Sequence, residues 1–338
     1  MNLKSRIEVL ARLGDHLRKK DEYLEALMHR ASFKNAWFTI ENQKEAVAAI
    51  ADNLLRREKL ETWLQRYEIP EETAPKTVGI VMAGNIPLVG FHDLLCVFAA
   101  GHRALVKLSE KDQYLLPYLL QLMAGFDKRA EAYFSIAEQL GGFDAVIATG
   151  SNNSARYFEA YFGKYPHIIR RNRNGVAVLS GEESPEELHE LGKDVFQYFG
   201  LGCRNVSKAY VPVNYDFEPL LEALHEYRQA VLHTRYKNNF DYNYALHVLN
   251  KEKFKANGCI ILREDPSLQS RIASLHYEFY DNPEEIEREL ENRSEEIQCV
   301  VARKGFLRRP VFPFGKAQQP ELWDYPDGVD TMNFLLKL

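Results

Sequence analysis

Residues 1–68 carry apolar side chains at helical spacing, for example at Ile7, Leu10 and Leu13. Steps of three and four residues place such side chains on one face of a helix. The pattern therefore predicts that this region is mostly helical. A polar, proline-bearing segment at residues 69–76 follows it and is typical of a linker.

From Thr77 the pattern changes to short apolar runs that alternate with amphipathic segments. Residues 77–82 and 104–108 have the pattern of buried strands, and residues 87–100 between them have that of a helix. Such a βαβ unit predicts parallel strands joined by a right-handed crossover. Further elements are predicted as helices at 112–123 and 127–140, strands at 145–149, 167–171 and 175–179, and a helix that starts near Ser154.

A second α/β region is predicted after residue 180. The helix at residues 184–198 starts with a serine N-cap, a proline at the first helical position and acids in the first turn. A strand at residues 208–213 follows. The later elements are predicted as a helix at 216–232, a strand at 258–263 and an acidic helix at 283–296.

Between that helix and strand lies the turn Gly200-Leu201-Gly202-Cys203. Its two glycines permit backbone conformations closed to other residues and let a substrate approach the main chain. A cysteine in such a turn can be partly exposed, and the adjacent Arg204 favours the thiolate that attacks carbonyl carbon. Free cysteines are more often buried small side chains, so the turn alone leaves a packing role open.

The strand at residues 145–149 ends in Thr149-Gly150-Ser151 before a helix. Backbone amides at a helix N-terminus can hold a phosphate group. The same three residues are also a common helix cap, so both interpretations stay open at this point.

The overall composition excludes several classes of protein. The chain has 338 residues, 46% hydrophobic and 27% charged, which suits a globular protein with more than one domain. Its net charge of -5 argues against nucleic acid or an anionic membrane as a partner. The four cysteines lack C-x-x-C spacing, which argues against structural zinc and a disulfide scaffold. With no signal-peptide pattern and no apolar run of about 20 residues, we expect no membrane span and a cytoplasmic location.

Four stretches occur in the order known from one protein superfamily. Ala83-Gly84-Asn85-Ile86-Pro87 resembles the Asn-x-Pro turn of the aldehyde dehydrogenases. Residues 101–110 resemble their strand that ends in Lys-Pro-Ser-Glu, although Leu108 stands here at the position of the proline. Residues 149–151 resemble the pyrophosphate-binding turn, and residues 200–203 resemble the nucleophile loop. The common order and the intervals of about 50 residues make a coincidence improbable.

Two further stretches narrow the resemblance. Residues 202–207 and 327–331 resemble the acyl-CoA reductase branch, which is related to the acyl reductase component of bacterial luminescence systems. The resemblance implies an aldehyde dehydrogenase-like α/β fold with a Rossmann-like domain for a nicotinamide cofactor. The expected domains are residues 1–180, with 311–338 returning to them, for the cofactor, and a second α/β domain at 181–310 that carries the catalytic cysteine.

The resemblance also implies roles for individual residues. Cys203 would attack an acyl thioester, expel coenzyme A and hold the acyl group as an enzyme thioester. The Asn85 side-chain amide and the Cys203 backbone amide would bind the oxyanion, and a nicotinamide would supply the hydride that releases the aldehyde. Cofactor contacts are implied for Lys107, Ser109 and Glu110 near the adenosine ribose and for Thr149, Gly150 and Ser151 near the pyrophosphate. Taken alone, Asn85 also suits a turn, and Lys107 also suits a solvated strand end.

One region departs from the pattern of the hydrolytic aldehyde dehydrogenases. Their glutamate general base lies in a Glu-Leu-Gly-Gly motif about thirty residues before the cysteine. Here residues 169–175 contain no carboxylate. Because water would be poorly activated, the acyl-enzyme would survive, which favours acyl-CoA reduction over oxidation of an aldehyde to the acid. The resemblance to the luminescence-type reductases implies a fatty acyl-CoA of medium or long chain as the substrate. Two alternatives stay open: an NAD(P)-dependent aldehyde dehydrogenase with a later acid such as Glu278 as its base, and an acyl-transfer or acyl-binding protein without a cofactor.

The choice of cofactor depends on two side chains. Glu110 can bond ribose hydroxyls and repel a 2′-phosphate, which favours NADH, whereas Lys107 can accept that phosphate. The luminescence-type relatives suggest NADPH, and we therefore expect NADPH rather than NADH. Acyl chain length, a homo-oligomeric state and an acyl-supplying protein partner are left open by the sequence.

Overall fold

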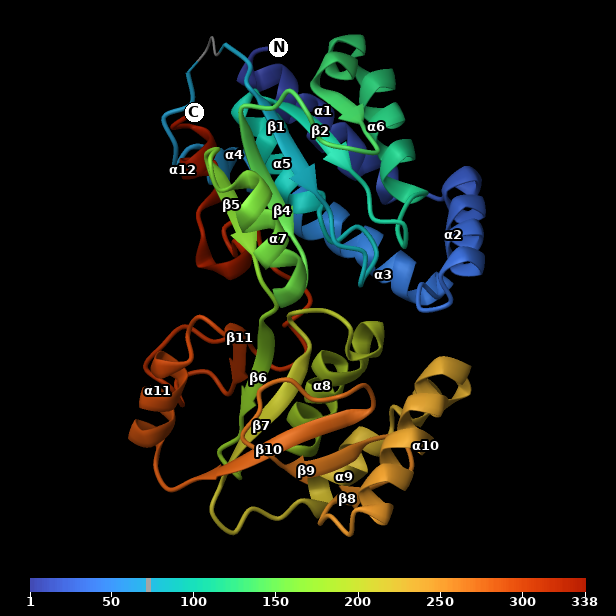
Figure 1. The fold of residues 1–338 in the computed structure, drawn as a ribbon, viewed down its shortest axis with the longest axis vertical. Coiled ribbons are helices and arrows are strands. Elements are labelled where there is room, and N and C mark those ends of the chain that lie inside the picture. The colour runs from blue at the N-terminus through green and yellow to red at the C-terminus, as the bar shows by residue number, and fades with distance from the viewer. Residues whose placement is uncertain (71–73) are drawn as a thin grey trace. The chain divides into compact units, whose positions relative to one another are not determined.

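The computed structural model describes residues 1–70 and 74–338, and the chain divides into two compact units (Figure 1). Residues 71–73, within the predicted linker, lie outside the described residues. Among the described residues, no helix has the length and apolar character that a bilayer crossing requires.

Contacts within the chain define the two units. Unit 1 comprises residues 1–172 and 320–338, and unit 2 comprises residues 173–319. The contacts thus divide the chain after residues 172 and 319, whereas the sequence prediction divides it after residues 180 and 310.

The first part of unit 1 is helical, as predicted. Side-chain caps start its first helices, since Asn2 accepts a hydrogen bond from the Ser5 amide and Asp21 accepts from the Leu24 amide. The predicted apolar face is buried, with Leu10 and Leu13 fully inaccessible. The helices are α1 (Leu3–Leu17), α2 (Glu22–Lys34), α3 (Ile40–Ala49), a π-helical turn at Ile50–Leu54 and α4 (Arg57–Leu64).

A parallel five-stranded sheet with the order β3-β2-β1-β4-β5 follows these helices. The predicted βαβ unit is confirmed, because β1 and β2 pair in parallel and α5 connects them. The connections leave β1 and β4 in opposite directions, so α5 and α6 cover one face of the sheet and α7 covers the other (Figure 1). The elements are β1 (Thr77–Val81), α5 (Phe91–Ala100), β2 (Arg103–Lys107), α6 (Leu115–Phe126), β3 (Phe134–Ile136), β4 (Ala145–Thr149), α7 (Asn152–Phe162), β5 (His167–Arg170) and α12 (Thr331–Leu335).

The predicted helix at residues 127–140 is wrong. Asp127 caps a short 3-10 helix at Lys128–Tyr133, and β3 follows it directly. Phe134 pairs with Ala104 of β2, so hydrogen bonding to the edge of the sheet outweighs the local helical pattern. The helix predicted near Ser154 begins earlier, at Asn152.

Unit 2 is built on a six-stranded sheet with the order β11-β6-β7-β10-β9-β8. All neighbouring strands are parallel except β8, which pairs antiparallel with β9. The predicted start of α8 is confirmed, since Ser184 and Glu187 form a reciprocal capping box. The elements are β6 (Asn174–Val178), α8 (Pro185–Phe196), β7 (Val206–Pro212), α9 (Glu218–His225), α10 (Thr234–Leu249), β8 (Lys255–Ala256), β9 (Ile261–Glu264), β10 (Ser274–Tyr280), α11 (Pro283–Asn292) and β11 (Ile297–Ala302).

Several boundaries in unit 2 differ from the prediction. The helix predicted at residues 216–232 is two pieces, α9 and a 3-10 helix at Arg228–Leu232. The strand predicted at 258–263 begins at Ile261. Strands β10 and β11 were not predicted. β10 mixes polar and apolar residues, whereas β11 is a short, mostly apolar run that pairs with β6, a strand more than 100 positions earlier in the chain.

Candidate active site

The candidate residues of unit 1 lie at one edge of its parallel sheet. The sheet changes direction between β1 and β4, which pair directly in the register Val81 to Ala148. In open α/β sheets, ligands bind beyond the carboxyl ends of the strands at such a point. The residues found there are Asn85 after β1, Lys107, Ser109 and Glu110 at the end of β2, and Thr149, Gly150 and Ser151 at the end of β4.

The turn that carries Asn85 packs against the turn that follows β2. Gly84 is buried, and a side chain at its position would collide with Ser109. After Asn85, Leu88 adopts a left-handed conformation with φ of 56°, and its amide donates to Asp112 Oδ2 at 2.7 Å. The Asn85 turn is therefore fixed by two contacts with residues 109–112 and is not a free loop.

Asp112 is a residue that the sequence analysis missed. Its carboxyl group is buried, and Oδ1 has no hydrogen-bond partner among the described residues. Burial raises the pKa of Asp112 to about 6, and the hydrogen bond from the Leu88 amide opposes that rise. No motif marks this aspartate, because its partner is a backbone amide 24 positions earlier in the chain.

The three residues predicted at the adenosine ribose, Lys107, Ser109 and Glu110, differ in their contacts and exposure. Lys107 is exposed, and its ammonium group donates to the Glu138 carbonyl at 2.9 Å. Ser109 Oγ accepts from the Lys111 amide at 3.3 Å, which shapes the turn. Glu110 is exposed at the surface of the same turn.

The Thr149-Gly150-Ser151 turn leads directly into α7. Ser151 Oγ accepts from the Ser154 amide at 3.2 Å, so the helix-cap interpretation of this sequence is confirmed. A side chain at Gly150 would come within 2.8 Å of Ser154 Cβ and 2.9 Å of the Phe158 ring. The close approach holds the turn against the first turn of the helix, whose leading amides have no acceptor within the helix. Those amides are suited to binding an anion.

The Cys203 turn of unit 2 has an unusual backbone. Tyr198, Phe199 and Gly200 have φ angles of 52°, 57° and 75°, so three consecutive residues adopt the left-handed conformation. The helix predicted to reach Tyr198 therefore ends earlier, at Phe196. For a residue other than glycine this conformation costs about 1–2 kcal/mol, and such strain gathers at functional sites. Cys203 itself is half-buried and reduced.

Asn205 ties the Cys203 turn to the end of α8. Its buried side-chain amide donates to the carbonyls of Asp194 at 2.9 Å and Gln197 at 2.8 Å. Its Oδ1 accepts from the Gly202 amide at 2.8 Å. Two of these hydrogen bonds satisfy carbonyls at the helix end, and the third fixes Gly202, the residue that precedes Cys203.

Arg204 contacts a segment that returns from later in the chain. Its Nε donates to the Ala317 carbonyl, and its guanidinium lies 4.5 Å from the centre of the Phe312 ring. The predicted effect of Arg204 on the Cys203 thiolate stays a prediction. Since Asn85 belongs to unit 1 and Cys203 to unit 2, their joint role at an oxyanion also stays a prediction.

The region that lacks the glutamate base contains a buried arginine. Arg170 forms an ion pair with Asp93 inside unit 1 and donates to Thr331 Oγ1 at 3.0 Å. Arg170 is thus engaged in the core of unit 1, where it holds the C-terminal segment.

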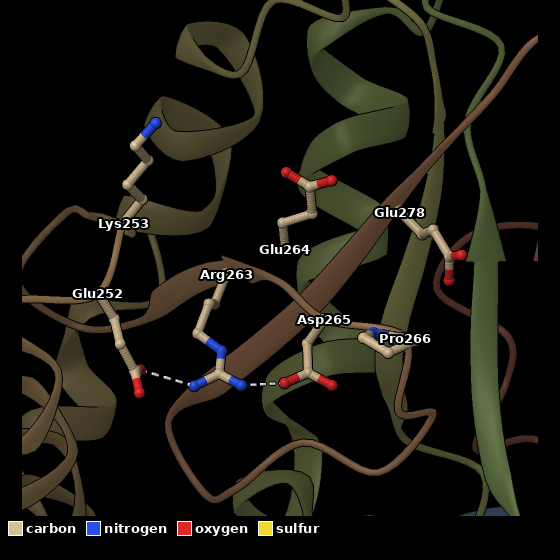
Figure 2. A pocket seen from close by; sticks show the side chains of 7 residues that line it. All are labelled: Glu252, Lys253, Arg263, Glu264, Asp265, Pro266 and Glu278. Carbon is tan, nitrogen blue, oxygen red and sulfur yellow. Dashed lines mark hydrogen bonds and ion pairs between the residues drawn. The ribbon is translucent and has the colours of Figure 1, made fainter. Parts of the chain in front are cut away.

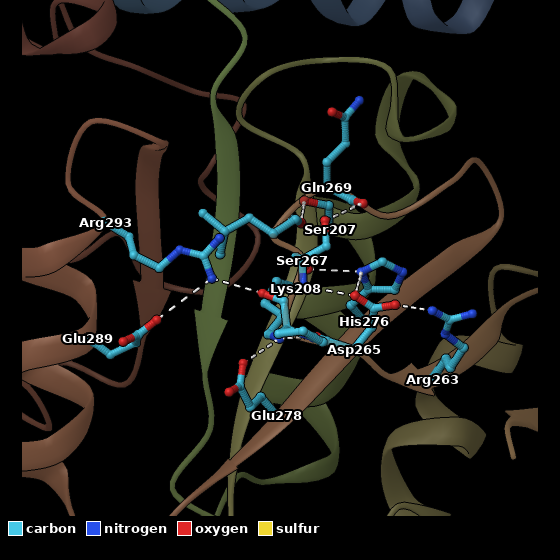
Figure 3. Close-up of polar contacts among 12 residues, drawn as sticks. Ser207, Lys208, Arg263, Asp265, Ser267, Gln269, His276, Glu278, Glu289 and Arg293 are labelled. Atoms are coloured by element: carbon cyan, nitrogen blue, oxygen red, sulfur yellow. Dashed lines mark hydrogen bonds and ion pairs between the residues drawn. The ribbon is translucent and has the colours of Figure 1, made fainter.

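Glu278, the later acid considered as a base, lies on β10. It lines an open pocket of about 510 Å³ in which Arg263 lies between Glu252 and Asp265 (Figure 2). Its Oε2 accepts from the buried Lys208 ammonium at 2.8 Å (Figure 3).

The strand register also gives the distance of Glu278 from the start of β7. Glu278 pairs with Tyr210, four residues beyond Val206, which corresponds to roughly 13 Å along the strand. Glu278 therefore lies away from the start of β7 and belongs to a polar cluster around Lys208. Among the described residues, no group of three or more His, Cys, Asp or Glu side chains could hold a metal ion.

Comparisons with known proteins agree on one fold. Residues 7–203 match the family model described as "Acyl-CoA reductase (LuxC)". No curated protein matches the chain. Aldehyde dehydrogenase 21 from Physcomitrella patens, in complex with succinate, is 14% identical with a TM-score of 0.66, covering 89% of this chain and 73% of that one.

Two other solved structures are similar to the same extent. Aldehyde dehydrogenase C from Pseudomonas syringae, a mutant in complex with NAD+ and octanal, is 13% identical with a TM-score of 0.65, covering 92% of this chain and 78% of that one. An NADP-dependent enzyme from E. coli is 13% identical with a TM-score of 0.64, and the match covers 94% of this chain and 76% of that one. The predicted aldehyde dehydrogenase-like α/β fold is confirmed.

Proposed function

Because the chain belongs to the LuxC family of acyl-CoA reductases, we propose that it reduces a fatty acyl-CoA to the aldehyde through a thioester on Cys203. The family and the fold make it an oxidoreductase that acts on acyl or aldehyde groups. The observation that carries the finer proposal is the Cys203 turn, in which a half-buried cysteine follows three left-handed residues. Its neighbours are fixed, because Asn205 bonds the Gly202 amide and Arg204 bonds the Ala317 carbonyl.

In the proposed reaction, the Cys203 thiolate attacks the acyl carbonyl carbon. A carbon–sulfur bond forms to Cys203 and the bond to coenzyme A breaks, so coenzyme A leaves as a thiolate that takes up a proton. The Asn85 amide and the Cys203 backbone amide stabilise the charge on the carbonyl oxygen. Without an activated water, the enzyme thioester persists until it is reduced.

The carboxyl edge of unit 1 suits a nicotinamide dinucleotide. The leading amides of α7 and the close turn at Gly150 would hold the pyrophosphate, and Lys107, Ser109 and Glu110 would lie at the adenosine ribose. When bound, the cofactor supplies a hydride to the acyl carbon. Cys203 then leaves as a thiolate when the resulting thiohemiacetal releases the aldehyde. We propose NADPH as the preferred cofactor.

The acyl group is proposed to be of medium or long chain. The related aldehyde dehydrogenase C structure holds octanal, a medium-chain aldehyde. In the residues before Cys203, the half-buried Phe199 ring packs 4.4 Å from the His233 ring and 5.9 Å from the buried Tyr236 ring. The cytoplasmic location, oligomeric state and any acyl-supplying partner stay predictions.

The test is intact-mass spectrometry of the protein incubated with decanoyl-CoA and no cofactor. We expect one acyl adduct on the wild type and none on Cys203→Ala, and release of decanal when NADPH or NADH is added. The matched control is Cys259→Ser, because Cys259 is a buried cysteine whose thiol has two possible acceptors, Asn257 Oδ1 and the Leu224 carbonyl, and a hydroxyl can donate to either of them. An adduct on Cys203→Ala, or none on the control and the wild type, would refute the proposal.

The two alternatives have separate tests. Oxidation of a free aldehyde to an acid requires a general base, and the engagement of Glu278 with Lys208 argues against that residue. Formation of NADPH from decanal that depends on added coenzyme A would favour the acyl-CoA reaction. A protein without a cofactor would show no rise in melting temperature with NADPH or NADH.

A further inference from the structure

Asp194 is a buried carboxylate on α8 to which the proposed mechanism assigns no role. Its side chain is 1% exposed. Oδ2 accepts from the Gly315 amide at 2.7 Å, and Oδ1 accepts from the Ala317 amide at 2.9 Å. The carboxylate therefore holds residues 315–317 against the helix with both of its oxygens.

The same three residues connect Asp194 to the Cys203 turn. The Ala317 amide donates to Asp194, and the Ala317 carbonyl accepts from Arg204 Nε. The main chain of Ala317 therefore bridges the side chains of Asp194 and Arg204. Gln318, the next residue, lies beside Gly202, where a side chain would come within 3.3 Å of Gln318 Nε2. The segment thus contacts both neighbours of Cys203.

A second connection runs through the main chain of Asp194. Its carbonyl accepts from Asn205 Nδ2 at 2.9 Å, and Asn205 Oδ1 accepts from the Gly202 amide at 2.8 Å. Asp194 therefore fixes the Cys203 turn at two points. Its main-chain carbonyl is linked to Gly202 through Asn205, and its carboxylate is linked to Arg204 through Ala317.

We propose that Asp194 is a positioning residue for Cys203, which holds the thiol and the backbone amide of that residue in the geometry needed to attack an acyl thioester. The proposal rests on the proposed function of Cys203. It predicts that the carboxylate form of Asp194 is required, because only this form accepts strongly from both amides. Protonation turns one oxygen into a hydroxyl, a much weaker acceptor, and so weakens one of the two contacts with residues 315–317.

The surroundings of Asp194 place this change near neutral pH. Burial raises the pKa of Asp194 to about 6, and the amides of Gly315 and Ala317 oppose the rise. Among the charged and titratable groups that face it, Glu190 raises the pKa and Arg204 lowers it, and Tyr227 lies on the neighbouring segment. The fraction with both contacts therefore grows as the pH rises through about 6.

The test measures two rates on Cys203 between pH 5 and 9. One is single-turnover acylation by decanoyl-CoA without cofactor, and the other is alkylation by iodoacetamide, which reads the thiol without an acyl substrate. For the wild type we expect a step near pH 6 in the acylation rate, in addition to the rise from thiol ionisation. For Asp194→Asn we expect acylation slowed about tenfold at pH 8 and no step near pH 6, since an amide group keeps only one acceptor.

Glu190→Gln provides a second variant that leaves both contacts in place. Glu190 raises the pKa of Asp194, so its neutralisation should move the acylation step to lower pH. A folded Asp194→Asn with the wild-type acylation rate and pH profile would overturn the proposal. Should decanoyl-CoA acylate no variant while alkylation still depends on Asp194, the proposed function fails and the positioning of Cys203 stands.

Discussion

Each unit contains one buried aspartate that holds the backbone beside a candidate catalytic residue. Asp112 in unit 1 accepts from the Leu88 amide, close to Asn85, and Asp194 in unit 2 accepts from two amides of the segment that contacts the Cys203 turn. Burial raises the pKa of both to about 6. In each unit, a buried carboxylate thus accepts hydrogen bonds from backbone amides near a candidate catalytic turn.

The two aspartates differ in how completely they are bonded. Both oxygens of Asp194 accept hydrogen bonds, whereas Asp112 Oδ1 has no partner in residues 1–70 and 74–338. Asp112 also borders a small enclosed cavity of about 10 Å³, lined mainly by apolar side chains. A fully bonded carboxylate stabilises its ionised form, and a half-bonded one is held ionised at a cost. The Cys203 turn is therefore the more firmly fixed of the two.

The largest expected effect is a loss in the free energy of unfolding at pH 8. We compare this loss between the variants Asp194→Ala and Asp112→Ala. Asp194→Ala leaves two buried amides without acceptors, and each costs about 1–3 kcal/mol, whereas Asp112→Ala leaves one such amide. Each variant also removes a buried charge whose pKa is raised to about 6, which offsets a similar part of both losses. We therefore expect Asp194→Ala to be less stable than Asp112→Ala by about 1–3 kcal/mol. Urea unfolding of the two variants measures both. Equal losses in the free energy of unfolding would show that the second amide hydrogen bond of Asp194 does not add to stability.

The pH dependence of stability sharpens the same comparison. A carboxyl group with a pKa raised from 3.8 to about 6 in the folded state binds its proton more tightly there, so stability falls as the pH rises from about 4 to 6. The shift corresponds to roughly 3 kcal/mol for Asp112. Asp112→Asn cannot titrate, and its melting temperature should fall less than that of the wild type between pH 4 and 7.

Asp127→Asn is the matched control for that measurement. Asp127 is half-buried, and its hydrogen bonds to Arg129 lower its pKa to about 2. Its titration therefore lies below pH 4, and its contribution to stability has the opposite sign. The slope between pH 4 and 7 should match the wild type in this variant, and a matching slope in Asp112→Asn would contradict the role given to burial.

The comparison also shows what the sequence could predict. The start of α8 was predictable because Ser184, Pro185 and Glu187 lie within one turn and make their contacts with each other. The Cys203 and Asn85 turns were found by short motifs. Asp112 and Asp194 were missed, since an isolated aspartate has no local pattern and the amides bound by Asp194 lie more than 120 positions later. Strands β3, β10 and β11 were missed for the same reason, because their partners are distant in sequence.

A pair of glycines tests whether the two units act separately. A side chain at Gly150 would meet Ser154 and Phe158 in unit 1, and one at Gly202 would come within 2.9 Å of Asn205 Oδ1 in unit 2. Overpacking of this kind costs about 1–3 kcal/mol, which corresponds to about fivefold in a rate or binding constant at the low end and more than about a hundredfold at the high end. Gly150→Ala should raise the KM for NADPH about tenfold and leave acylation unchanged, and Gly202→Ala should do the reverse. Steady-state and single-turnover kinetics on each variant would separate the effects, and a shared loss would contradict the division.

The smallest expected effect concerns the choice of cofactor at Glu110. This carboxylate is exposed on the turn after β2, while Lys107 nearby donates to the Glu138 carbonyl. An exposed charge acts through solvent and is worth less than about 1 kcal/mol, so Glu110→Ser should raise the ratio of kcat/KM for NADPH to that for NADH by up to about fivefold. Glu131→Ser, which removes another exposed glutamate of unit 1, should leave the ratio unchanged. If both variants keep the wild-type ratio, Glu110 does not contact the 2′ position, and Lys107 becomes the residue to test there.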